Sequence, residues 1–234
     1  MYYENYRYWG GELKYGETFK IDKEIVNLTK KKLPKALFIP TASGDSEKYF
    51  DIFKQIYGKK LGCKVEVLYL IKDKLSKNDI NEKILSSDLI YIGGGNTNKL
   101  LDVWKKKEID KILKKAGNKG IILSGLSAGA YCWSNKSLSS SKEQIYNGLE
   151  FIKLNFVCHY SKKNKEIVFK NLKKLKKPIV ALENNSAIEI IGDKYRILTS
   201  SKNAKAYKLY LDNDNILEKK LQVDNKFRKV KSLL

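Results

Sequence analysis

The chain has 234 residues, 42% of them hydrophobic and 31% charged, which fits one globular domain with a core of its own. No stretch approaches the roughly 18 uninterrupted apolar residues of a membrane span, and the first residues lack the basic start and apolar centre of a signal peptide, so we expect a cytoplasmic protein with no membrane partner. The formal net charge is +21, yet only three of the 47 Lys and Arg residues are arginine. Because arginine is the residue suited to bidentate reading of phosphates and bases, we expect no specific nucleic-acid partner.

The predicted elements alternate between short apolar strands and amphipathic helices. Residues 1–30 are aromatic and rich in turns, and we expect there an extension with a strand or hairpin that packs on the main body and a weak helix over 21–28. A core from about 36 to 210 follows. Its strands are predicted over 36–39, 65–70, 88–92, 120–123, 156–159 and 178–182, and its helices over 45–61, 76–84, 97–104, 108–115, 128–133 and 164–175. The segments 186–191, 196–199 and 206–211 predict short antiparallel strands.

This alternation with short connections predicts an α/β fold, a doubly wound and mostly parallel sheet with helices on both faces and a few antiparallel C-terminal strands. No internal repeat or long linker divides the chain, so we expect a single domain over 1–234. Loops that follow parallel strands share one edge of such a sheet. We therefore expect polar residues after five strands to lie together: Thr41, Gly93, Ser127, His159 and Glu183.

One sequence motif predicts a catalytic nucleophile. The residues Gly125-Leu126-Ser127-Ala128-Gly129 form G-x-S-x-G between an apolar strand and the start of a helix, which is the context of a nucleophile elbow. A serine hydroxyl needs a base to take its proton, and His159 is the one histidine of the chain. His159 ends an apolar strand, where α/β folds gather their functional residues. Ser127 and His159 are therefore the predicted nucleophile and base.

The three cysteines have no metal-type spacing, and we expect reduced, buried thiols. Cys132 lies within the helix after Ser127, and Cys158 points to the opposite face of its strand from His159. We therefore expect neither cysteine to be a nucleophile. We also expect no metal site and no cofactor.

The order of four motifs is specific: GGGNT at 93–97, GLSAGA at 125–130, the strand that ends at His159, and ENNSA at 183–187. This order resembles the peptidase E and cyanophycinase family of serine peptidases. The resemblance implies a flavodoxin-like fold, similar to class I glutamine amidotransferase domains but with serine in place of their cysteine. It implies hydrolysis of small peptides: some members cleave dipeptides with an N-terminal aspartate, and others an aspartate–arginine storage polymer.

The resemblance also implies roles for individual residues. Ser127 matches the family nucleophile and His159 the base, while the amides of Gly95 and Ala128 match the oxyanion hole. The glycine-rich loop is expected to bind substrate through Gly94, Asn96 and Thr97.

The residue that orients His159 is open to two matches. Peptidase E-like members carry an aspartate in the loop after the elbow helix, where this chain has Ser140. Cyanophycinase-like members use a glutamate downstream of the histidine, and Glu183 fits that place. A histidine base needs an acceptor for its second ring N–H, so we expect Glu183 to face His159.

Three alternatives to a dipeptidase E-like enzyme remain at this stage. The first is a cyanophycinase-like hydrolase. The second is a catalytically weak, amidotransferase-like domain that only binds a ligand or partner, and the third is a polyanion-binding protein driven by its lysines. A small peptide is the expected partner, and the sequence does not decide between a monomer and a dimer.

Overall fold

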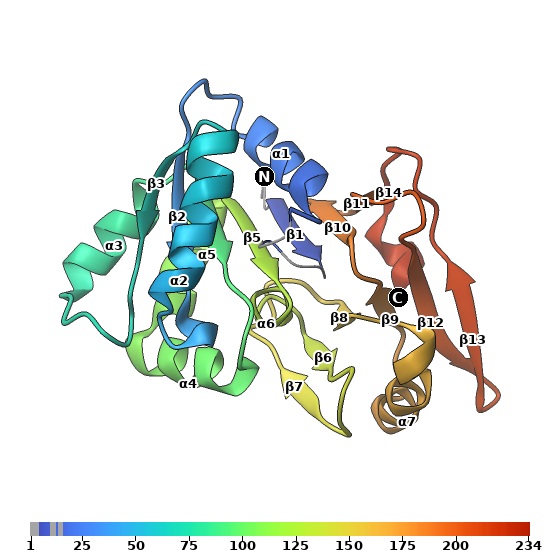
Figure 1. Ribbon diagram of the computed structural model, residues 1–234. Coiled ribbons are helices and arrows are strands. Elements are labelled where there is room, and N and C mark those ends of the chain that lie inside the picture. The colour runs from blue at the N-terminus through green and yellow to red at the C-terminus, as the bar shows by residue number, and fades with distance from the viewer. Residues whose placement is uncertain (1–4, 10–12, 14–15) are drawn as a thin grey trace.

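The computed structural model describes residues 5–9, 13 and 16–234, and its frame consists of two mixed sheets (Figure 1). The larger sheet contains β1 (Asn5–Trp9), β2 (Lys35–Ile39), β3 (Lys64–Val67), β4 (Leu89–Ile92), β5 (Ile122–Leu126), β10 (Ser186–Ile191), β11 (Lys194–Thr199) and β14 (Arg228–Lys229). Their order is β14-β11-β10-β1-β5-β4-β2-β3. The run from β1 to β3 is parallel, whereas β10, β11 and β14 are antiparallel to their neighbours.

The smaller sheet contains β6 (Lys136–Leu138), β7 (Ile145–Asn147), β8 (Asn155–Cys158), β9 (Ile179–Leu182), β12 (Ala206–Asp212) and β13 (Asn215–Lys220). Their order is β13-β12-β9-β8-β6-β7, with β6, β8 and β9 parallel. The expectation of one sheet edge is thus corrected, because the strand that ends at His159 belongs to a different sheet from the strand before Ser127.

Helices cover both faces of the larger sheet. They are α1 (Phe19–Leu28), α2 (Glu47–Phe53), α3 (Lys77–Leu85), α4 (Thr97–Lys107), α5 (Ile109–Asn118) and α6 (Ala128–Tyr131). A further helix, α7 (Lys165–Leu175), packs on the smaller sheet. Side chains alternate along β2, so that Ala36 and Phe38 pack with α1 and α2 while Leu37 and Ile39 pack with α3, α4 and α5. The predicted α/β architecture, with a mostly parallel central sheet and antiparallel C-terminal strands, is confirmed.

The N-terminal strand lies inside the larger sheet rather than on its outside. β1 pairs in parallel with β5 and antiparallel with β10, so that Trp9 aligns with Leu126 on one side and Ala187 on the other. Part of the predicted extension, residues 1–4, 10–12 and 14–15, lies outside the described residues. β1 therefore joins β5, which leads to Ser127, to β10, which follows the loop 183–185.

A buried carboxyl group lies beneath α1. Asp22 is fully buried and accepts hydrogen bonds from the hydroxyl groups of Thr18, at 2.7 Å, and Tyr57, at 2.8 Å. Burial raises the pKa of Asp22 to about 7, although the two hydrogen bonds act in the opposite direction. Burial also raises the pKa of Tyr57 well above its ordinary value, so this hydroxyl remains a donor.

This carboxyl group predicts a pH dependence of stability. The pKa is higher in the folded than in the unfolded protein, so folding is favoured as pH falls through about 7 toward the unfolded value of 3.8. The full effect is on the order of 4 kcal/mol. We expect the melting temperature of the wild-type protein to rise as the pH falls from about 8 to about 5, and we expect Asp22→Asn to flatten this rise. Identical pH dependence in the two proteins would contradict this assignment.

Candidate active site

Ser127 occupies a sharp turn between β5 and α6. Its backbone has φ 52° and ψ −112°, a conformation that L-residues adopt only under constraint. The residues on both sides are buried, but Ser127 itself is partly exposed. The turn thus holds the hydroxyl group out of the core, as the predicted nucleophile elbow requires.

The first glycine of the motif is required by packing. A Cβ atom at Gly125 would lie 2.0 Å from the carbonyl oxygen of Gly129, far inside van der Waals contact. The strand and the following helix can therefore approach each other only without a side chain at this position. The spacing G-x-S-x-G consequently reflects the backbone crossing that forms the elbow.

His159 bridges Ser127 and a third side chain. Its Nε2 atom lies 2.9 Å from Ser127 Oγ, and its Nδ1 atom lies 2.7 Å from Asn184 Oδ1. An amide oxygen can only accept, so the Nδ1–H group donates to Asn184 and Nε2 is left to accept from the Ser127 hydroxyl. This is the tautomer that a general base for serine needs.

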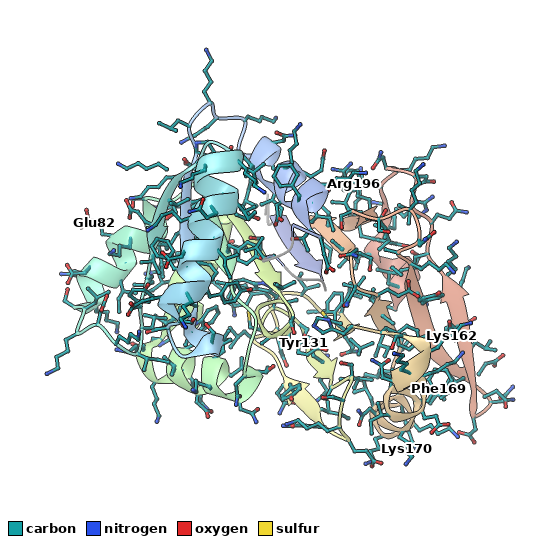
Figure 2. All side chains as sticks on the ribbon, viewed as in Figure 1. Glu82, Tyr131, Lys162, Phe169, Lys170 and Arg196 are labelled. Carbon is teal, nitrogen blue, oxygen red and sulfur yellow. The ribbon has the colours of Figure 1, made fainter. Side chains whose placement is uncertain are left out.

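Tyr131 connects the two sheets beside this pair (Figure 2). It is the last residue of α6, and its hydroxyl oxygen accepts a hydrogen bond of 3.0 Å from the backbone N–H of Cys158, at the end of β8. The same hydroxyl group interacts with Ser140. The helix after Ser127 is thereby held to the strand before His159, and Ser140 has a contact with Tyr131 in place of the imidazole contact that an orienting residue would make.

The expectation that Glu183 orients His159 is corrected. The Glu183 carboxylate accepts hydrogen bonds from the backbone N–H of Lys205, at 2.9 Å, and from the Tyr207 hydroxyl, at 3.2 Å. The backbone N–H of Glu183 also donates to the Lys205 carbonyl, which extends the pairing of β9 with β12. This pairing directs Glu183 toward β12, and the next residue, Asn184, reaches the imidazole.

Asn184 was not among the residues predicted from sequence. The motif ENNSA could have pointed to Asn184, because asparagine can serve as the third residue beside a histidine base, as it does in papain-like proteases. The amide fixes the tautomer and orientation of the ring but adds no negative charge. His159 therefore has an orienting partner without the electrostatic support that a carboxylate gives to an imidazolium.

The two backbone N–H groups expected to bind an oxyanion belong to the start of α6 and to the glycine-rich loop. Ala128 is the first residue of α6, so its N–H has no acceptor within the helix. Gly95 has φ 143°, and a Cβ atom there would lie 2.3 Å from the Ala42 carbonyl oxygen, so only glycine fits. A Cβ atom at Gly94 would lie 3.4 Å from that of Ser127, which places the glycine-rich loop against the elbow.

The other two predicted substrate-binding residues have structural contacts. Asn96 uses its Oδ1 atom to cap α4, where it accepts a hydrogen bond of 3.0 Å from the backbone N–H of Lys99. Thr97 is buried at the first position of that helix. Gly94 is thus the one of the three predicted residues that these contacts bring to Ser127.

Comparison with known proteins places these features in a family. The model of peptidase family S51 matches residues 9–198. The chain belongs to peptidase family S51. This membership identifies the protein as a serine-type peptidase, which is a hydrolase. It also confirms the resemblance noted from the sequence motifs.

Relatives of this S51 peptidase carry peptidase names. An uncharacterized peptidase of Bacillus subtilis (strain 168), YgaJ, is 32% identical over 220 residues, which are 92% of this chain and 94% of that protein. A crystal structure of a peptidase from an acI-B1 Actinobacterium has a TM-score of 0.74 at 18% identity and covers 97% of both chains. A protein of Listeria monocytogenes EGD-e described as a peptidase E has a TM-score of 0.66 at 22% identity, over 85% of this chain and 100% of that chain. These two structures share the fold of this peptidase.

The cysteines near the S51 peptidase site are buried thiols. Burial raises the pKa of Cys132 well above its ordinary value and that of Cys158 to about 12. The Cys132 thiol donates to the Gly129 carbonyl oxygen at 3.1 Å. A protonated, buried thiol is a poor nucleophile.

We therefore expect thiol-directed reagents to leave the activity of the native S51 peptidase unchanged. Incubation with iodoacetamide, followed by a rate measurement and mass spectrometry of the intact protein, checks this. Inactivation that disappears in Cys132→Ala or Cys158→Ala would show that the prediction is wrong.

Neither a metal cluster nor a membrane helix is found in the part of the S51 peptidase that the structure describes. No group of three or more His, Cys, Asp and Glu side chains there could hold a metal ion. No helix among the same residues is long and apolar enough to cross a bilayer.

Proposed function

We propose that this S51 peptidase hydrolyses small peptides through Ser127, with His159 as general base and Asn184 as the residue that orients it. The observation that carries the proposal is the continuous pair of hydrogen bonds from Ser127 Oγ through both nitrogens of His159 to Asn184 Oδ1. A strained elbow that exposes the hydroxyl supports it.

The steps follow from this arrangement. His159 Nε2 takes the proton of Ser127 as Oγ attacks the scissile carbonyl, and the N–H groups of Gly95 and Ala128 stabilise the oxyanion. The imidazolium then gives its proton to the leaving amine, and an acyl group remains on Ser127. Water, activated by the same imidazole, hydrolyses this ester and regenerates the serine.

The proposed substrates are small peptides, with dipeptides that begin with an acidic residue as the first to test. The net charge of +21 supports this choice, because a positive field raises the local concentration of acidic molecules. The S51 membership supports peptide hydrolysis, and the side-chain preference is our proposal.

A fluorophosphonate probe tests the nucleophile. We expect wild-type protein to be labelled at Ser127, and Ser141→Ala, which removes an exposed hydroxyl, to be labelled equally. A panel of dipeptides and tripeptides, with released amines measured, tests the reaction. A protein that is folded but neither labelled nor hydrolytic would instead be the binding domain that the sequence left open.

A further inference from the structure

An open pocket borders His159 without including Ser127. Its volume is about 440 Å³, and three loops line it. The side chains that concern recognition are those of His159, Ser161, Lys162, Asn184, Asn185 and Asn203.

The position of this pocket suits the leaving group of the proposed reaction. In acyl transfer the acyl group stays on the serine, whereas the departing amine takes its proton from the histidine. A pocket that contains the histidine but not the serine therefore fits the residue that leaves. Apart from the Glu183 carboxylate, its lining of amides, a hydroxyl and a cation fits a polar, anionic group.

Lys162 is the cation of this pocket, and its backbone is fixed relative to His159. It begins a short turn, Lys162–Asn164, at the N-terminal end of α7 (Figure 2). Asn164 holds this turn: its Nδ2 atom donates to the His159 carbonyl oxygen at 2.6 Å, and its Oδ1 atom accepts from the Ser161 N–H at 2.9 Å. The ammonium group makes no ion pair with any described residue, which leaves its charge available to a ligand.

The carboxylate within the same pocket is already engaged. Glu183 receives hydrogen bonds from the Lys205 N–H and the Tyr207 hydroxyl. These donors hold the carboxylate toward β12, and the exposed side chains of Lys202 and Lys205 near the same loops add positive charge. The pocket can therefore accept an anion beside Lys162.

We propose that Lys162 binds the C-terminal carboxylate of the leaving residue, so that the enzyme selects peptides in which the scissile bond is one residue from a free C-terminus. This inference rests on the proposed function and adds its substrate class. An ammonium group and a carboxylate form a charge-assisted hydrogen bond, and amidation of the C-terminus removes the negative charge. The selection therefore depends on the carboxylate rather than on the side chain of the leaving residue.

The test compares the best dipeptide of the panel with its C-terminal amide. We expect the wild-type protein to favour the free acid by at least about tenfold in kcat/KM. Lys162→Gln should remove that preference through a higher KM for the acid, with the amide unchanged. Lys162→Arg should retain most of the preference, and the adjacent, exposed Lys163→Gln should retain all of it.

The outcomes separate this inference from the function on which it rests. Equal rates on acid and amide in the wild-type protein, equal losses on both in Lys162→Gln, or cleavage of longer peptides alone would overturn the role of Lys162 while probe labelling of Ser127 still stood. Failure of the fluorophosphonate probe to label Ser127 would overturn the proposed function itself.

Discussion

Ser127→Ala is expected to lower kcat by about 10⁶-fold. In the proposed mechanism the change removes the atom that forms the acyl bond, and the oxyanion donors alone would retain only a small residual rate. His159→Ala should cost about the same, because an unactivated hydroxyl is a poor nucleophile at neutral pH. The double variant should be no slower than either single variant, since the two groups act as one unit.

Stability provides the control for this result. Ser127 is partly exposed and its hydroxyl makes no core contact, so Ser127→Ala should keep the melting temperature of the wild-type protein. Circular dichroism and thermal unfolding check this on the same sample as the kinetics. A well-folded Ser127→Ala protein with substantial activity would rule out serine catalysis at this site.

Asn184→Ala is expected to lower kcat by about 10² to 10⁴-fold, with little change in KM. The substitution removes the acceptor of the His159 Nδ1–H group, so the ring loses the tautomer and orientation that its Nε2 atom needs. In a known triad the loss of the correct tautomer cost about 10⁴-fold. Because the interaction strengthens as the imidazolium forms, the loss should fall on kcat.

Two neighbouring substitutions sharpen this prediction. Asn184→Asp supplies a carboxylate that stabilises the imidazolium, so activity should be kept and the acid limb of the pH profile should move to higher pH. Glu183→Gln should have a much smaller effect than Asn184→Ala, because Glu183 contacts Lys205 and Tyr207. The opposite ranking, with Glu183→Gln as the severe variant, would return the orienting role to Glu183.

The elbow could be predicted from sequence because its requirements are local. Gly125 must lack a Cβ atom, Ser127 must sit at the turn, and α6 must start at once, and all three conditions concern residues within one short segment. His159 could be predicted because it is the one histidine of the chain and ends an apolar strand. Local geometry and the single histidine were sufficient to predict that Ser127 and His159 form a pair, and the structure joins them by a hydrogen bond.

The orienting residue could not be predicted, because it depends on a long-range pairing. Glu183 and Asn184 are adjacent, and their side chains point in different directions. Which of them faces His159 is decided by the pairing of β9 with β12, where Ala206 aligns with Leu182. The division into two sheets could not be predicted for the same reason. The periodicity of a strand shows that the strand is buried, but it does not show which other strand it pairs with.

The central place of β1 bears on how the protein folds as it is synthesised. β1 is synthesised before both of its partners, β5 and β10, and β10 is synthesised after β2, β3, β4 and β5. The long stretches of chain that separate β1 from its partners make this central pairing slow to form. Until it forms, the edges of β5 and β1 can pair with other chains. Production of this enzyme should therefore benefit from slow translation or chaperones, and an N-terminal fusion that restrains residues 5–9 should impair folding more than a C-terminal one.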